Sequence, residues 1–271
     1  MKADTKSHTS GGQGQNMTLG KLTLLFACSL APLASHAKNE EFTKPWDDSS
    51  RAIVIDPYEG NEKLDWDEIA KDKRVVAIIH RATQGNETDA KYCERKAEAL
   101  KRGYLWGSYH LGRPGDPIAQ AKFYLDVTRP ADNELIALDI EDTSSRDMSL
   151  ADAEVFIDYI ARQTGRYPVF YTNHNTARII TERARGKATV FSKTPLWYAR
   201  YLSNVTDFPK GVWTTYALWQ FSSEQNCKQT GKCLYNVPGT DHYMDINVFY
   251  GSPEELKARW PFRSPTVEAT N

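Results

Sequence analysis

A pair of carboxylic acids one residue apart is the feature of this sequence that most directly indicates chemistry. Asp139 lies near the end of the apolar run 134–140, and Glu141 directly follows that run. Because side chains alternate between the two faces of a strand, both carboxylates are expected to point the same way. Two acids held close together push their pKa values apart, which lets one stay protonated near neutral pH. Such a pair suits the cleavage of a glycosidic bond.

Two further acids stand beside apolar runs that also read as strands. Asp56 ends the run 52–56, and Asp245 lies in the run 244–248. If the strands close into a barrel, the first and last strands are neighbours, and catalytic groups gather at one mouth. We therefore expect four acids to converge there and to form the catalytic set: Asp56, Asp139, Glu141 and Asp245.

A Mg²⁺ or Ca²⁺ site is the main alternative for such a cluster, because hard cations prefer oxygen ligands. No glycine-rich phosphate loop and no Asp-rich calcium loop accompanies the four acids, whereas aromatic residues do. We expect no metal and no other cofactor. Each aromatic residue taken alone is more often part of a core, but their recurrence at strand ends favours a sugar platform, since sugar rings have apolar faces. The candidates are Tyr109, Tyr171, Trp197 and Trp219.

Short β-branched or aromatic runs alternate with helical stretches from about residue 51 to residue 260, which is typical of strands joined by crossover helices. Helices are predicted at 91–102, 118–127 and 149–165, whereas the connections after the sixth and seventh predicted strands lack a long amphipathic repeat. We predict an α/β fold, an irregular TIM-like β/α barrel with eight strands and with some helices missing in its second half. The predicted strands are 52–56, 75–81, 104–110, 134–140, 167–172, 196–199, 216–221 and 244–248.

The charge balance of the 271-residue chain excludes some partners. There are 34 Lys and Arg residues against 35 Asp and Glu residues, for a formal net charge of −1. A chain without a basic surplus is a poor binder of a phosphate backbone, so we expect no nucleic-acid partner.

The N-terminal region resembles an export signal. The apolar stretch 22–34 follows a lysine and leads to a small-x-small ending at Ala37, after which we expect cleavage. The stretch is short for a membrane span. We expect an exported protein, periplasmic or secreted, with lipoprotein anchoring through Cys28 as the alternative. The predicted divisions are an extension and signal at 1–37, an exposed linker at 38–50, a barrel at 51–262 and an exposed tail at 263–271.

The remaining cysteines suggest one disulfide bond. Cys227 and Cys233 flank a short polar loop, and an oxidising compartment would let them pair. Zinc binding is the alternative, but the spacing is wide for a zinc knuckle and no histidine pair follows. Cys93 is expected to be an unpaired helix residue.

The ordered motifs resemble those of the glycoside hydrolase family 25 lysozymes, the muramidases that cleave peptidoglycan between N-acetylmuramic acid and N-acetylglucosamine. The resemblance covers nearly all of residues 51–250 and rests on the succession of motifs, each of which is weak alone. Gln84 departs from the family, because an acid is usual there. The matching segments are Val54-Ile55-Asp56, Leu64-Asp65-Trp66, 79–85 (IHRATQG), 107–114 (GSYHLGRP), Leu138-Asp139-Ile140-Glu141, 167–172 (YPVFYT), 196–201 (LWYARY), 218–221 (LWQF) and 245–249 (DINVF).

The resemblance implies an exported hydrolase that acts as a monomer on peptidoglycan glycan strands and has no stable membrane span. Glu141 would be the general acid and base, Asp139 its partner, and Arg81 a substrate-binding residue of the 79–85 turn. Two acids on one strand project in parallel, which favours substrate assistance with net retention over direct attack by Asp139. A non-catalytic peptidoglycan-binding protein and a glycosidase acting on chitin-like polymers are the alternatives.

Overall fold

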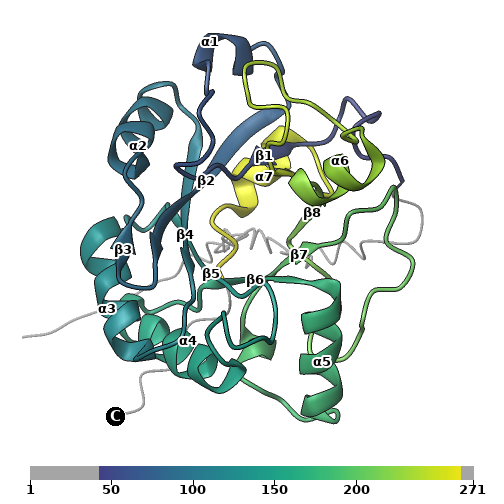
Figure 1. Ribbon diagram of the computed structural model, residues 1–271. Helices are drawn as coiled ribbons and strands as arrows, with labels where there is room; N and C mark the ends of the chain where they lie inside the picture. The colour runs from purple at the N-terminus through teal and green to yellow at the C-terminus, as the bar shows by residue number, and fades with distance from the viewer. Residues whose placement is uncertain (1–42, 264–271) are drawn as a thin grey trace, which may run out of the picture. The chain divides into compact units, whose positions relative to one another are not determined.

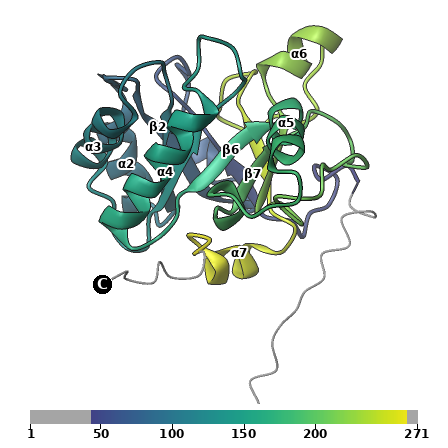
Figure 2. The ribbon, with the colours of Figure 1, turned by 90° about the horizontal axis from the view of Figure 1, so that it is seen from below.

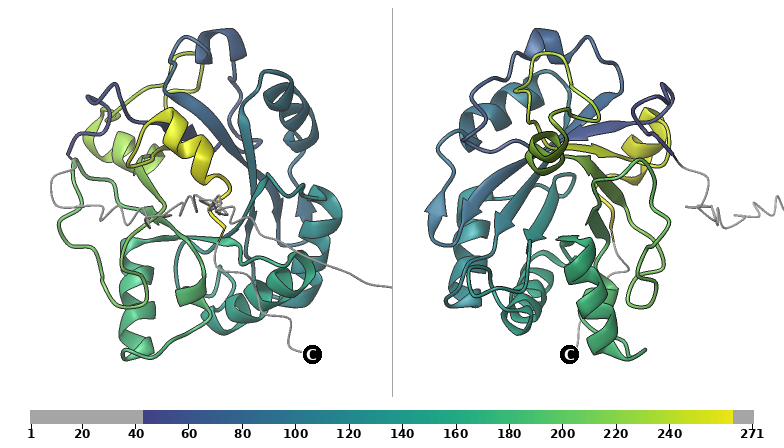
Figure 3. Two further views of the ribbon diagram at one scale, coloured as in Figure 1. Left: turned by 180° about the vertical axis from the view of Figure 1, so that it is seen from behind. Right: turned by 45° about the vertical axis from the view of Figure 1, so that its right-hand side comes forward.

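The computed structural model describes residues 43–263. The predicted signal at 1–37 and the tail beyond residue 263 lie outside these residues. Eight strands form one sheet that closes on itself through the pairing of β1 with β2 (Figures 1 and 3). A two-residue strand, β3 (Glu87–Thr88), pairs only with the end of β2. The barrel strands are β1 (Ile53–Ile55), β2 (Val75–Gln84), β4 (Leu105–Leu111), β5 (Leu135–Asp139), β6 (Val169–Asn173), β7 (Leu196–Ala199), β8 (Leu218–Ser222) and β9 (Ile246–Val248).

The last strand departs from the parallel arrangement that the sequence pattern indicates. Strands β1 to β8 of the barrel pair in parallel, but β9 is antiparallel to both of its neighbours, β1 and β8. The helix between β8 and β9, α6 (Glu224–Thr230), rises only about 10 Å at 1.5 Å per residue. The connection therefore stays at the mouth, and β9 runs back into the barrel from that side.

Side chains alternate between the barrel interior and the layer beneath the helices. On β5, Ala137 packs with the interior cluster and Leu138 with the outer one; on β8, Leu218 is interior and Trp219 is outer. Large apolar side chains gather in the outer layer, where burial stabilises each by about 1.5–3 kcal/mol. The alternation turns Asp139 inward at the end of β5.

Four longer helices surround the sheet (Figures 1 and 3). They are α2 (Tyr92–Lys101), α3 (Pro117–Thr128), α4 (Leu150–Thr164) and α5 (His174–Ala184). The three predicted helices are confirmed. Ser149 caps α4 by accepting a hydrogen bond from the Asp152 amide at 3.1 Å, and Gly165 ends it at a φ of 71°.

The second half of the barrel has fewer helices, as expected. Between β7 and β8 the described chain has no helix. The remaining elements are short: α1 (Trp66–Ile69), the 3₁₀ turn η1 (Phe191–Lys193) and α7 (Pro253–Arg259). Helix α7 lies apart from α2–α5 (Figure 2), and its Leu256 packs with interior residues such as Ala52 and Phe249. In residues 43–263 we find no helix with the length and apolar character of a membrane span.

The segment 38–50 is not simply an exposed linker. In its described part, Pro45 is buried and the Trp46 ring lies 5.6 Å from the Phe221 ring. The carbonyl of Trp46 accepts a hydrogen bond from Arg74 at 2.9 Å. This corrects the expectation for residues 43–50, because a proline and a tryptophan bury apolar surface against the barrel.

Candidate active site

The four predicted acids meet at one mouth of the barrel. Asp56 follows β1, Asp139 ends β5, and Glu141 lies two residues further on. Asp245 directly precedes β9, and its carbonyl accepts a hydrogen bond from the Asp56 amide at 3.2 Å. Because β9 is antiparallel, its amino end lies beside the carboxyl ends of the parallel strands.

The acids differ in their contact with solvent. Asp56 and Asp139 are 4% and 6% exposed, whereas Glu141 is exposed. One carboxyl oxygen of Asp139 is buried and accepts no hydrogen bond from the described residues. Glu141 is therefore the acid that a large substrate in solvent can reach, and Asp139 lies deeper, with one acceptor still to satisfy.

The electrostatic environment of the cluster favours protonated carboxyl groups. Burial and the charge of Glu141 raise the pKa of Asp245 to about 8. Burial raises the pKa of Asp139 well above its usual range, and the charge of Glu141 adds to this. Partial desolvation raises the pKa of Glu141, with Asp147 as the second cause. An acid that keeps its proton near neutral pH is able to protonate a leaving oxygen.

Asp56 lies in a hydrogen-bonded network that sequence reasoning missed. Asn247 and Gln220 each donate an amide hydrogen to Asp56, at 2.5 and 2.8 Å. The indole N–H of Trp197, which can only donate, bonds the Asn247 oxygen at 2.5 Å and so turns the amide nitrogen toward Asp56. The hydroxyl of Tyr171 bonds the Gln220 oxygen at 2.6 Å. The amides oppose the effect of burial and of Asp245, which raise the pKa of Asp56.

Three of the four predicted aromatic residues line the interior below the acids, and one does not. Tyr109 and Tyr171 pack against Trp197, with ring centroids 6.1 and 4.8 Å away, and all three are less than a tenth exposed. The prediction for Trp219 is wrong: it is fully buried in the outer layer and its N–H bonds the Arg200 carbonyl. The interior position next to it on β8 belongs to Gln220.

Arg81 lies at the rim of the mouth, engaged with acidic neighbours. Its guanidinium bonds Glu59 at 3.0 Å and Asp89 at 3.2 Å, and it donates to the Gln84 side chain at 3.2 Å. Gln84, where the family usually has an acid, thus accepts a hydrogen bond without adding charge. Contact between Arg81 and substrate stays a prediction.

The loop that carries Glu141 is held by Asp147, a residue that no sequence pattern distinguishes. Asp147 is buried, and one of its carboxyl oxygens accepts hydrogen bonds from the amides of Glu141 and Asp142, each at 2.9 Å. Its other oxygen bonds Arg113 at 2.8 Å. An aspartate six residues after Glu141 in a polar loop has no distinguishing pattern, so only the folded loop reveals this contact.

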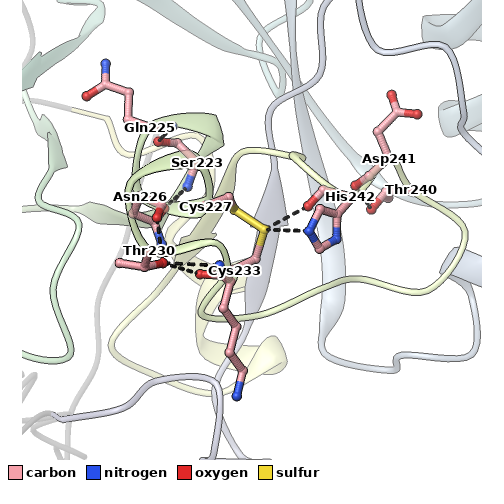
Figure 4. Close-up of a disulfide and its surroundings, with 10 residues drawn as sticks. Ser223, Gln225, Asn226, Cys227, Thr230, Cys233, Thr240, Asp241 and His242 are labelled. Atoms are coloured by element: carbon pink, nitrogen blue, oxygen red, sulfur yellow. Dashed lines mark hydrogen bonds between the residues drawn. A yellow bond between two sulfur atoms is a disulfide. The ribbon is translucent and has the colours of Figure 1, made fainter.

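The predicted disulfide is present beside the site. Cys227 and Cys233 are bonded to each other (Figure 4), and Cys93 is a free, exposed residue of α2. Helix α6 begins at Glu224, whose amide bonds the Asp245 carboxylate and opposes the rise in its pKa. Within residues 43–263, no group of three His, Cys, Asp or Glu side chains is arranged to hold a metal ion.

Comparison with known proteins identifies the family. Residues 55–230 match glycosyl hydrolases family 25. The chain belongs to this family. As a family 25 member it is a glycoside hydrolase. Its barrel, with four acids at the mouth, has the architecture of this family.

Individual proteins are similar to this chain in fold or in sequence. A bacterial lysozyme from Streptomyces coelicolor superposes with a TM-score of 0.64 at 24% identity, covering 78% of this chain and 97% of the lysozyme. A muramidase from Trichobolus zukalii gives a TM-score of 0.59 at 26% identity, covering 76% and 97%. The uncharacterized protein YegX of Escherichia coli O157:H7 is 26% identical over 218 residues, which are 75% of this chain and 71% of YegX.

Proposed function

We propose that this family 25 enzyme hydrolyses peptidoglycan at the β-1,4 bond between N-acetylmuramic acid and N-acetylglucosamine. The observation that carries the proposal is the solvent-exposed Glu141 beside the buried, incompletely bonded Asp139 at the mouth of a family 25 barrel. The side-chain amides of Gln220 and Asn247 and the aromatic rings of the barrel interior lie below these two acids. These groups are uncharged, which suits a neutral sugar.

The proposed reaction uses the substrate's own N-acetyl group. Its carbonyl oxygen attacks the anomeric carbon while the bond to the leaving oxygen breaks, and Glu141 transfers its proton to that oxygen. Asp139, in its ionised form, accepts a hydrogen bond from the acetamide N–H and stabilises the positive charge of the cyclic intermediate. In the second step the water oxygen bonds to the anomeric carbon while the bond from this carbon to the acetamide oxygen breaks, which restores the N-acetyl group, and Glu141 takes a proton from the water. Two displacements at one carbon give net retention.

The proposed place of action is outside the cytoplasm, either the periplasm or the exterior. A disulfide bond in the described chain is consistent with an oxidising compartment. The export signal at 1–37, cleavage after Ala37 and the lipoprotein alternative remain predictions on residues that the structure does not describe.

The decisive experiment is mass spectrometry of the products released from purified sacculi, combined with NMR of the first anomer formed. We expect reducing N-acetylmuramic acid ends in the β configuration. Initial inversion contradicts the substrate-assisted route, and release of fragments only from N-acetylglucosamine oligomers supports a chitin-directed enzyme. Binding to sacculi without any cleavage identifies a non-catalytic protein.

Glu141→Gln tests the assignment of the acid. This change removes the transferable proton and preserves the shape of the side chain, so we expect kcat to fall at least about 100-fold. The melting temperature is expected to stay within about 3 °C of the wild type, because the side chain is exposed. Wild-type turnover in the variant contradicts the role of Glu141.

A further inference from the structure

The two exposed aromatic side chains of residues 43–263 flank the acid cluster. Tyr58 follows Asp56 by two residues and is 37% exposed; Tyr243 precedes Asp245 by two residues and is 42% exposed. Two residues span at most about 7 Å of chain, so both rings lie close to the mouth. The aromatic side chains inside the barrel are buried and thus less accessible to a polymer.

The Tyr58 ring is held in place without being covered. Its backbone forms a turn in which the Asn61 side chain accepts the Tyr58 amide hydrogen at 2.9 Å, and Arg95 bonds the Tyr58 carbonyl at 2.9 Å. The Arg81 guanidinium lies 4.7 Å from the ring centroid. A Cβ atom at Gly60 would lie 2.3 Å from the ring, so this orientation requires glycine there. A pre-formed turn reduces the entropic cost of binding.

The Tyr243 ring is held by the disulfide-bonded connection. The Lys228 ammonium lies 5.8 Å from its centroid and the His242 ring 4.9 Å from it. The Cys233 sulfur lies 3.0 Å from the His242 carbonyl oxygen. Figure 4 shows His242 beside the disulfide. The disulfide thus contacts the residue immediately before Tyr243.

The loops that carry the two rings are joined to each other. The amide of Asp65 bonds the Gly239 carbonyl at 2.8 Å, and the amide of Lys63 bonds the Asp241 carboxylate at 3.1 Å. The Lys228 ammonium, which lies over the Tyr243 ring, also forms an ion pair with Glu224. The connections that carry the two rings are therefore hydrogen-bonded to each other beside the mouth.

We propose that Tyr58 and Tyr243 form a rim subsite that stacks on one sugar ring of the glycan strand, beyond the two sugars that share the cleaved bond. This inference rests on the proposed function. An amino-sugar ring has an apolar C–H face that fits an aromatic ring, and polar edges that fit the tyrosine hydroxyls and the Lys228 ammonium. The rim subsite holds the strand so that the scissile bond lies over Glu141.

Two measurements test the rim subsite. The first is KM for soluble, uncrosslinked glycan strands with the Tyr58→Ala and Tyr243→Ala variants. We expect each to raise KM about tenfold with little change in kcat, because the lost stacking acts on binding. Tyr58→Phe and Tyr243→Phe retain the rings and should recover most of the affinity. Val155→Ala, an exposed apolar change on α4, is the matched control.

The second measurement is calorimetric binding of the same strands to the Glu141→Gln protein, with and without each alanine substitution. We expect a Kd about tenfold weaker for each alanine variant, and no such difference for the disaccharide, which does not extend to the rim. If the wild type is active and the Tyr58→Ala and Tyr243→Ala variants have the same KM and Kd as the Val155→Ala control, the proposed rim subsite is overturned. A wild type that neither cleaves nor binds the strands overturns the proposed function as well.

Discussion

At the level of single residues, one barrel mouth gives each carboxyl group a different environment. Asp56 receives two amide hydrogens, Asp139 has a buried oxygen without a hydrogen-bond partner among the described residues, and Glu141 reaches solvent. These differences suit the acids to different roles. Hydrogen bonds donated to a carboxyl group favour its charged form, and burial favours its neutral form. Glu141 is the member suited to proton transfer.

The Asp147→Asn variant tests whether the charge of Asp147 beside Glu141 sets the pH range in which the enzyme is active. Partial desolvation and the charge of Asp147 both raise the pKa of Glu141. Asparagine keeps a carbonyl acceptor for the backbone amides and removes the charge, so the pKa falls. Since the acid must be protonated, we expect the alkaline limb of the kcat/KM profile to move to lower pH.

The opposite change provides the control. Arg113 lowers the pKa of Glu141, so Arg113→Ala should move the same limb to higher pH. Shifts in one common direction for the two variants would indicate a loop rearrangement instead of an electrostatic effect.

At the level of elements, the connection between β8 and β9 decides what the mouth contains. It turns back before crossing the barrel, places Asp245 next to Asp56 and brings α6 against Asp245. A seven-residue helix has little stability of its own. Its capping box at Ser223 and the disulfide at its end therefore hold it in place.

Replacing both bonded cysteines tests this element. For the Cys227→Ser, Cys233→Ser double variant we expect a loss of about 2 kcal/mol of unfolding free energy, because a six-residue loop is no longer closed. We also expect an increase in KM similar to that of Tyr243→Ala. Urea unfolding and steady-state kinetics measure the two effects, and Cys93→Ser is the matched control.

At the level of the whole molecule, the buried acid Asp245 makes the stability of the fold depend on pH. Asp245 has its pKa raised to about 8, far above the value of about 3.9 in an unfolded chain. Below about pH 4 the carboxyl group is protonated in both the folded and the unfolded state and the raised pKa costs no stability. Between about pH 4 and pH 8 ionisation in the unfolded chain progressively destabilises the fold, and above about pH 8 this destabilisation is greatest. Active sites commonly retain such costs because function requires the charges.

The Asp245→Asn variant should remove this cost. We expect its melting temperature to exceed that of the wild type by at least about 3 °C at pH 8, corresponding to about 1 kcal/mol, with a smaller difference at pH 5. Calorimetry at the two pH values measures this. Asp126→Asn, which removes an exposed charge from α3, is the control. A difference independent of pH would contradict the electrostatic explanation.

The sequence by itself determined the strands, three of the four longer helices, the four acids and the disulfide, because these depend on local periodicity and on residue chemistry; it missed helix α5 (His174–Ala184). Periodicity of two places Trp219 and Gln220 on opposite faces, but it does not say which face is interior. That choice, the antiparallel direction of β9 and the contact of Asp147 with Glu141 were decided by the tertiary structure. Each depends on packing between segments distant in the chain or on the path of a loop, which no local pattern encodes.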